Sequence, residues 1–132
     1  MPLFVYGSLR PGMPLWHVIR DHVVDRTPAT VAGRLHWHEG HEWPLLTEGD
    51  RVVHGDLLQL TPGDAVSRVI VNEELAYGYD ARWISVTTAA GTEQALALVW
   101  AHASEVGPEI TGGDYTAEAD TAVTSPSNPD RP

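Results

Sequence analysis

The stretch Phe4-Val5-Tyr6-Gly7-Ser8-Leu9-Arg10-Pro11-Gly12 is the most informative part of the chain. In it an apolar strand ends abruptly in a glycine turn, and this turn carries the hydroxyl of a serine. The run Leu3–Tyr6 is short, apolar and bounded by Gly7, which is typical of a buried strand. Gly7 can adopt backbone dihedrals that are closed to other residues, and successive N–H groups in such a turn form a nest for a small anion. We therefore expect the turn to bind a carboxylate or a developing oxyanion. The alternative is an ordinary first strand and tight turn.

The rest of the chain contains several strand patterns and two helical patterns. Apolar residues recur at helical spacing in two stretches, Met13–His22 and Asp64–Tyr77. Strands are expected at Thr30–His36, Arg51–Leu60, Ala81–Thr88 and Glu93–His102, the last two forming a hairpin. This mixture predicts an α+β domain, a small, mixed, partly closed β-barrel of five to seven strands with two short helices.

The domain organisation follows from length and composition. With 132 residues, of which 42% are hydrophobic, the chain can bury one core but not two. We place this domain at residues 1–116. From residue 117 the chain is rich in Pro, Ser, Thr and acids and has almost nothing to bury, which predicts a disordered acidic tail over residues 117–132.

Charge and cysteine content exclude several classes of partner and site. The formal net charge is -10, and all eight basic residues are arginine, so nucleic acid is not an expected partner. The absence of cysteine excludes disulfides, thiolate nucleophiles and cysteine-based metal sites. No signal peptide or apolar run of membrane-spanning length is visible, so we expect a cytoplasmic protein with no membrane partner. The sequence does not indicate an oligomeric state.

Two adjacent glutamates carry the second chemical feature. If Asp64–Tyr77 is a helix, Glu73 lies in the middle of its apolar stripe, and Glu74 lies about 100° around the axis. A carboxylate on a buried face is costly unless it is neutral, paired or in contact with a ligand. One of the two is therefore a candidate general acid–base, with Glu73 preferred from its position. The alternative is that the helix frays and both carboxylates are solvated.

The turn resembles the N-terminal signature of the γ-glutamylcyclotransferase-like family, which includes γ-glutamylamine cyclotransferases. The family carries Tyr-Gly-Ser/Thr-Leu or Asn there, matching Tyr6, Gly7, Ser8 and Leu9. Two further stretches are similar to family elements, Y-D-A-R after the glutamates and G-G-D-Y at Gly112–Tyr115.

The resemblance implies the same partly closed barrel and assigns roles to matching residues. It implies that the turn residues Tyr6, Gly7, Ser8 and Leu9 bind substrate, together with Tyr79 at the start of Y-D-A-R. It also implies that one glutamate is essential. The chain has I-V-N-E-E at residues 70–74 where the family more often has Leu-Asp-x-aromatic-Glu-Gly, so the choice between Glu73 and Glu74 stays open.

The chemistry of such an enzyme is coherent with these parts. In a γ-glutamyl amine or amide the α-amine attacks the γ-carbonyl of the same molecule, which gives 5-oxoproline and a free amine. Proximity lowers the barrier, a glutamate moves the protons, and the turn grips the α-carboxylate or the oxyanion. The expected partner is a small γ-glutamyl compound, and no cofactor or metal is needed.

Two other functions remain open from the residues. His36, His38 and His41 lie with two glutamates within the eight residues H-W-H-E-G-H-E-W, which is compatible with a metal-binding module or a metal-dependent hydrolase. Their spacing matches neither H-E-x-x-H nor a helical pair, so a polar loop between strands is favoured, ending in an aromatic-Pro element at Trp43-Pro44. The other alternative is a non-catalytic binder of small ligands with the same fold.

Overall fold

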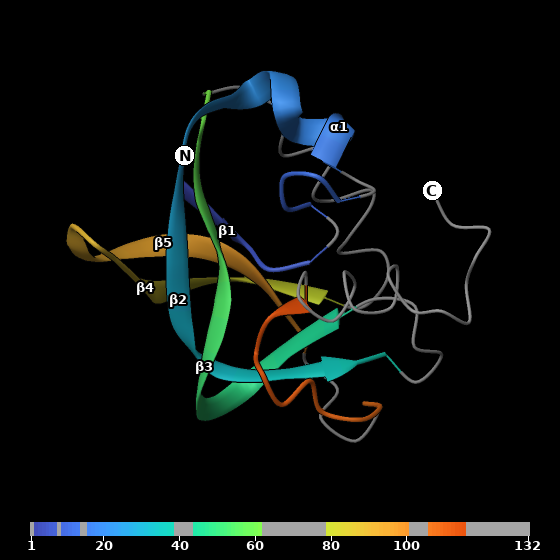
Figure 1. The fold of residues 1–132 in the computed structure, drawn as a ribbon. Helices are drawn as coiled ribbons and strands as arrows, with labels where there is room; N and C mark the ends of the chain where they lie inside the picture. Colours follow the sequence, from blue (N-terminus) through green and yellow to red (C-terminus); the bar gives the residue numbers. More distant parts are fainter. Residues whose placement is uncertain are drawn as a thin grey trace.

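Five strands and two short helical segments make up the part of the chain described by the computed structural model. That part comprises residues 2–7, 9–13, 16–38, 44–61, 79–100 and 106–115. The elements in chain order are β1 (Pro2–Val5), α1 (Trp16–Ile19), the 3-10 helix η1 (Arg20–His22), β2 (Val23–Trp37), β3 (Pro44–Leu60), β4 (Tyr79–Thr88) and β5 (Gly91–Trp100). Figure 1 shows the long β2–β3 pair crossed by the β4–β5 hairpin, with α1 at one end.

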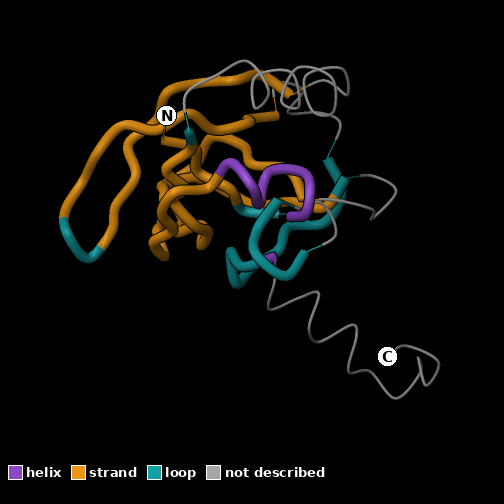
Figure 2. Tube along the Cα trace, turned by 90° about the horizontal axis from the view of Figure 1, so that it is seen from above, coloured by secondary structure: helices purple, strands orange, loops and turns teal. Residues whose placement is uncertain are grey.

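The strands form a ring in the order β1-β3-β2-β4-β5. Long antiparallel ladders join β2 to β3 and β4 to β5, and β1 lies antiparallel to β3. The other two seams are short: Thr30 of β2 pairs with Thr87 of β4, and Leu3 of β1 pairs in parallel with Leu96 of β5. The result is the predicted small, mixed, partly closed barrel. The tip of the β4–β5 hairpin projects beyond the ring (Figure 2).

The strands predicted from apolar runs are confirmed, but β2 and β3 are longer than predicted. β2 adds Val23–Ala29 and Trp37, and β3 adds Pro44–Asp50. These additions contain exposed polar residues, which the cross-strand ladder holds in extended conformation regardless of their local preference. The register shifts after Gly33, where β2 residue 33 pairs with Arg51 and residue 34 pairs with Thr47. Residues 48–50 therefore bulge out of the ladder.

Only one of the two predicted helices falls within the described residues, and it is shorter than predicted. α1 makes a single turn that η1 continues to His22. Four α-helical residues are too few to add a useful dipole to the preceding turn. The predicted helix Asp64–Tyr77 and the whole predicted tail lie outside the described residues. No described helix has the length and apolar character that a membrane crossing requires.

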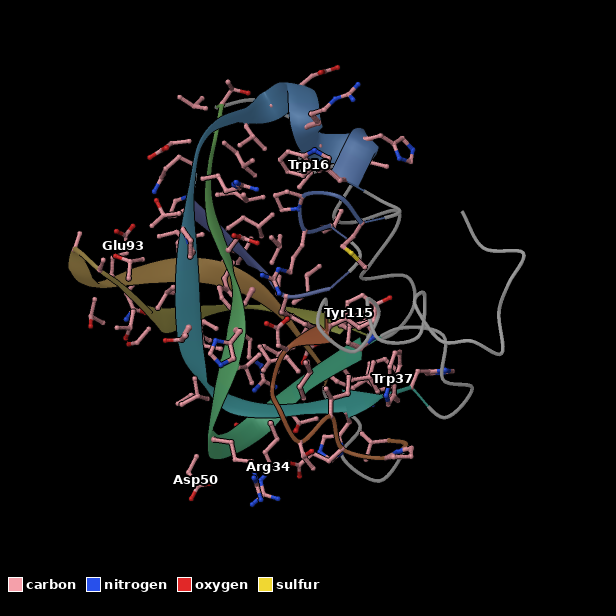
Figure 3. The ribbon with its side chains drawn as sticks, in the orientation of Figure 1. Trp16, Arg34, Trp37, Asp50, Glu93 and Tyr115 are labelled. Atoms are coloured by element: carbon pink, nitrogen blue, oxygen red, sulfur yellow. The ribbon has the colours of Figure 1, made fainter. Side chains whose placement is uncertain are left out.

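Side chains on the two faces of β1 and β5 enter two different apolar clusters. Phe4 and Tyr6 point to one cluster, together with alternate residues of β5 and with Ile110 and Tyr115. Leu3 and Val5 point to the other, with Leu9, Ile19 and the remaining apolar residues of β5. In Figure 3, Tyr115 and Trp37 lie side by side, and their ring centroids are 5.5 Å apart. The end of β1 is thus packed on both faces, which holds the turn that follows it.

Candidate functional site

The turn after β1 is closed by its own backbone. The Arg10 N–H donates to the Gly7 carbonyl at 3.0 Å, and the Met13 N–H donates to the Arg10 carbonyl at 3.0 Å. No described residue accepts a hydrogen bond from the N–H of Gly7 or Leu9. Donors in a turn without a protein acceptor are suited to an anionic ligand. Ser8, which lies between them, is outside the described residues.

Gly7 is required by a close approach and not by its backbone dihedrals. The positive φ angles among the described glycines belong to Gly12, Gly91 and Gly113, so Gly7 does not use the special dihedrals considered from the sequence. A Cβ at Gly7 would lie 2.6 Å from Cγ of Pro44 and 3.2 Å from its Cδ. Pro44 begins β3 and belongs to the predicted aromatic-Pro element, and it packs directly on the turn.

Two buried tyrosines tie the surrounding strands together at this end of the barrel. The Tyr6 hydroxyl donates to the Leu98 carbonyl at 2.5 Å and accepts from the Leu46 N–H at 3.3 Å. The Tyr79 hydroxyl donates to the Pro44 carbonyl at 2.8 Å. Each tyrosine has one hydroxyl proton, and both protons are given to backbone carbonyls. Tyr6 therefore links β5 to β3, and Tyr79 links β4 to the start of β3.

The predicted site residues that the structure describes therefore come together. Tyr6, Gly7 and Leu9 come from the end of β1, and Tyr79 comes from the start of β4. Leu9 is buried in the same apolar cluster as Tyr79, which places its side chain in the core and leaves its backbone for a ligand. Glu73 and Glu74 lie outside the described residues, so their role stays a prediction.

An ion-pair cluster beside the turn was not predicted from the sequence. Arg10 Nε lies 2.9 Å from Asp56 Oδ2, and Arg10 Nη1 lies 3.0 Å from Asp114 Oδ1. The side chains of Arg10 and Asp56 are only 14% and 9% exposed, so the pair is largely removed from water. One signal for it was available, because Asp56 places a charge directly before Leu57 and Leu58 in the predicted strand Arg51–Leu60.

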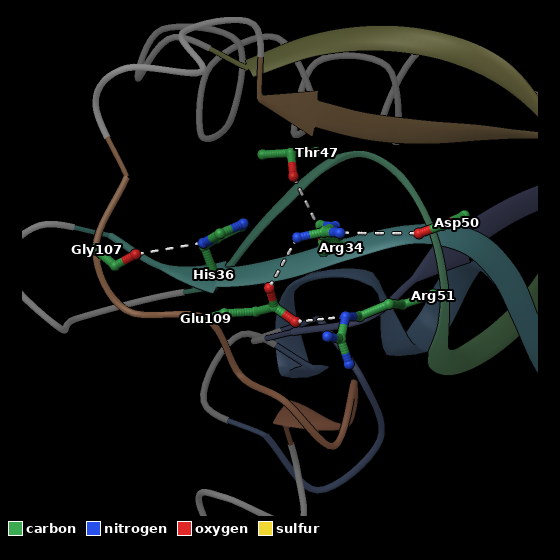
Figure 4. A network of polar contacts seen from close by, with 7 residues as sticks. All are labelled: Arg34, His36, Thr47, Asp50, Arg51, Gly107 and Glu109. Atoms are coloured by element: carbon green, nitrogen blue, oxygen red, sulfur yellow. Dashed lines mark hydrogen bonds and ion pairs between the residues drawn. The ribbon is translucent and has the colours of Figure 1, made fainter.

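A second, more exposed cluster holds the C-terminal segment against β2 and β3 (Figure 4). Glu109 Oε1 lies 3.4 Å from Arg34 Nη1, and Glu109 Oε2 lies 3.0 Å from Arg51 Nε without hydrogen-bond geometry. Arg34 also approaches Asp50 at 3.9 Å. The two ion pairs of Glu109 hold residues 106–115 against β2 and β3. They share no residue with the ion pairs of Arg10 beside the turn.

The histidines of the predicted loop make different contacts. His36 Nδ1 lies 3.3 Å from the Gly107 carbonyl, and the His38 ring packs edge-on to Trp100 with centroids 6.4 Å apart. His41 lies outside the described residues. Within the described ranges there is no group of three His, Cys, Asp or Glu side chains placed to hold a metal ion.

Comparisons with known proteins agree with this architecture. A search of the curated proteins finds no match. Among solved structures, the uncharacterized protein PH0828 from Pyrococcus horikoshii is 21% identical with a TM-score of 0.68, over 92% of this chain and 95% of that one. An AIG2-like protein from Mus musculus is 20% identical with a TM-score of 0.65, over 76% of each chain.

YkqA from Bacillus subtilis is 19% identical with a TM-score of 0.75. The match covers 95% of this chain but only 43% of YkqA, so the chain spans less than half of that protein. At these identities the structures show a shared fold. The family model described as gamma-glutamyl cyclotransferase, AIG2-like, matches residues 3–117. The chain belongs to the AIG2-like gamma-glutamyl cyclotransferase family.

Proposed function

We propose that this protein is a cyclotransferase that converts a γ-glutamyl amine or amide into 5-oxoproline and a free amine. The observation that carries the proposal is the turn after β1. Its Gly7 and Leu9 N–H groups have no acceptor among the described residues, and it lies in a chain whose family match covers residues 3–117. These N–H groups are suited to an anionic part of such a substrate, either its α-carboxylate or the oxyanion on the γ-carbonyl.

The reaction needs no nucleophile from the protein. The α-nitrogen of the substrate forms a bond to the γ-carbon, and the bond from that carbon to the leaving nitrogen breaks. Two protons leave the α-ammonium, and the leaving nitrogen departs as a protonated amine, so charge is conserved. Holding the flexible substrate with nitrogen and carbonyl in contact supplies part of the rate, up to about 7–11 kcal/mol for well-oriented intramolecular reactions.

Proton transfer is assigned to one glutamate, with Glu73 preferred and Glu74 as the alternative. A partly buried carboxyl accepts a proton from the α-ammonium and returns it to the leaving nitrogen. Tyr6 and Tyr79 then serve as supports, since their hydroxyl protons are donated to Leu98 and Pro44. Ser8, which lies between Gly7 and Leu9 in the sequence, is assigned a hydroxyl contact to the substrate.

The test is turnover of a panel of γ-glutamyl amines and γ-glutamyl amino acids, followed as free amine and 5-oxoproline. Glu73→Gln keeps the shape of the side chain but cannot accept a proton, and we expect a loss of about 10²–10⁴-fold in kcat with substrate binding retained. Glu74→Gln is the matched control. Loss in Glu74→Gln alone moves the assignment by one position, and full activity in both variants refutes the mechanism.

The same assay separates the two alternatives. Binding of the panel without turnover in the wild type supports a non-catalytic binder. A metal-dependent hydrolase would lose activity with a chelator and would release glutamate in place of 5-oxoproline.

A further inference from the structure

Arg10 forms ion pairs with two carboxylates, Asp56 and Asp114, at the edge of the turn. Its guanidinium uses two different edges, donating from Nε to Asp56 at 2.9 Å and from Nη1 to Asp114 at 3.0 Å. The partners are 46 and 104 residues away in the chain, so the cluster joins three distant segments. Planar, charge-assisted hydrogen bonds of this kind fix orientation as well as distance.

Both carboxylates are anchored to β3, Asp56 directly and Asp114 through the neighbouring Gly113. Asp56 belongs to β3 and pairs with Val5, the last residue of β1. Asp114 follows Gly113, whose carbonyl accepts a hydrogen bond of 2.7 Å from the His54 N–H of β3. Gly113 has a φ of 68°, and a Cβ there would collide with the Val52 carbonyl. Asp114 therefore has little freedom of its own.

The backbone of Arg10 completes the connection to the turn. Its N–H closes the turn onto the Gly7 carbonyl. When β3 holds the Arg10 guanidinium, it therefore also holds the Arg10 backbone. That backbone sets the conformation of the turn that contains Gly7 and Leu9. Two carboxylates already engage the guanidinium, which disfavours direct capture of a substrate carboxylate by Arg10.

We propose that Arg10, held by Asp56 and Asp114, is a positioning residue that aligns the Gly7 and Leu9 N–H groups for the substrate. The C-terminal segment 106–115 thereby supports the site through Asp114 rather than only covering the barrel. The proposal rests on the proposed function, because the aligned donors are those assigned to the γ-glutamyl substrate. An error of about 1 Å in such donors can cost on the order of 10²-fold in rate.

The test compares Asp114→Asn with Glu109→Gln, because both remove ion pairs of the same segment but only Asp114 contacts Arg10. We expect kcat/KM for a γ-glutamyl amine to fall about ten- to a hundredfold in Asp114→Asn and to stay within about twofold in Glu109→Gln. Thermal melts establish the folded fraction of each variant. If Asp114→Asn is unfolded at the assay temperature, Arg10→Lys replaces it, since an ammonium keeps the charge but loses the planar fork.

A double-mutant cycle then asks whether Asp114 acts through Arg10. In an Arg10→Gln background the further change Asp114→Asn should cost nothing more in kcat/KM. Additive losses, or equal kcat/KM in Asp114→Asn and Glu109→Gln, would overturn the proposal while wild-type turnover upholds the proposed function.

Amide hydrogen exchange provides a readout that does not depend on turnover. We expect faster exchange of the Arg10 amide, whose hydrogen bond to the Gly7 carbonyl closes the turn, in Asp114→Asn than in the wild type or Glu109→Gln. Unchanged exchange would refute the positioning role. A wild-type protein that turns over no member of the γ-glutamyl panel would instead refute the proposed function, and exchange would still decide the role of Arg10.

Discussion

Replacing Gly7 by alanine places a methyl group where the structure has no room for one. The new Cβ would lie 2.6 Å from Cγ of Pro44, whereas carbon atoms in ordinary contact are about 3.5–4.0 Å apart. About 1 Å of movement is therefore needed between the turn and the start of β3. Pro44 cannot move alone, because its carbonyl accepts a hydrogen bond from the Tyr79 hydroxyl and because Pro44 pairs with Trp37 of β2.

Overpacking of this kind costs about 1–3 kcal/mol. For a domain of this size we expect a fall in melting temperature of about 4 °C per kcal/mol, so Gly7→Ala should melt about 4–12 °C below the wild type. Circular dichroism melts and urea titrations measure this. The turnover assay should show a fall in kcat/KM as well, because the displaced segment carries the Gly7 and Leu9 N–H groups.

Two other glycines provide controls. Gly112→Ala meets nothing within 4 Å and has no positive φ, so we expect stability close to the wild type. Gly12→Ala also meets nothing but has a φ of 83°, so it should cost about 1–2 kcal/mol through backbone strain alone. The reasoning is refuted if Gly7→Ala is as stable and as active as Gly112→Ala.

Three further changes have defined outcomes. Tyr6→Phe removes the hydroxyl that links Leu98 to Leu46 and should lower the free energy of unfolding by about 1–3 kcal/mol in urea titrations; an unchanged midpoint would contradict the strand-linking role. Ser8→Ala should lower kcat/KM about ten- to a hundredfold with little change in stability, since a hydrogen bond to a charged group contributes about 1.5–3 kcal/mol; equal kinetics would restrict the turn to its backbone donors. Truncation before Thr116 should leave the melting temperature and turnover unchanged, and a drop of many degrees would show that the tail packs on the domain.

Local patterns predicted the strands best where both faces are buried. β1 and β5 were predicted from nearly continuous apolar runs, and each contributes to both apolar clusters, whereas β4 was predicted from an alternating pattern and is mostly exposed. The extension of β2 was missed because residues such as Asp25 and Arg26 are exposed and polar. Their extended conformation depends on pairing with a distant strand, and local preference does not carry that information. The short seams that close the ring are likewise set by tertiary packing.

The candidate site was predictable only where short local motifs mark its residues. The turn and Tyr79 were found from short motifs, and the structure brings them together around Pro44. The role of Arg10 was missed because its partners Asp56 and Asp114 are distant in the chain, and only the charge of Asp56 within a predicted strand pointed to it. The need for Gly7 was attributed to its dihedrals, whereas it arises from packing on a proline 37 residues later, a contact that only the fold creates.

The most direct test of cyclotransfer is the identity of the product formed from a γ-glutamyl amine in water enriched in a heavy oxygen isotope. Because the substrate's own amine attacks the carbonyl, we predict 5-oxoproline in equal amount to the released amine, without heavy oxygen in its ring carbonyl. Mass spectrometry of the products measures both quantities. Release of labelled glutamate with the amine would show attack by water and would contradict the proposed reaction.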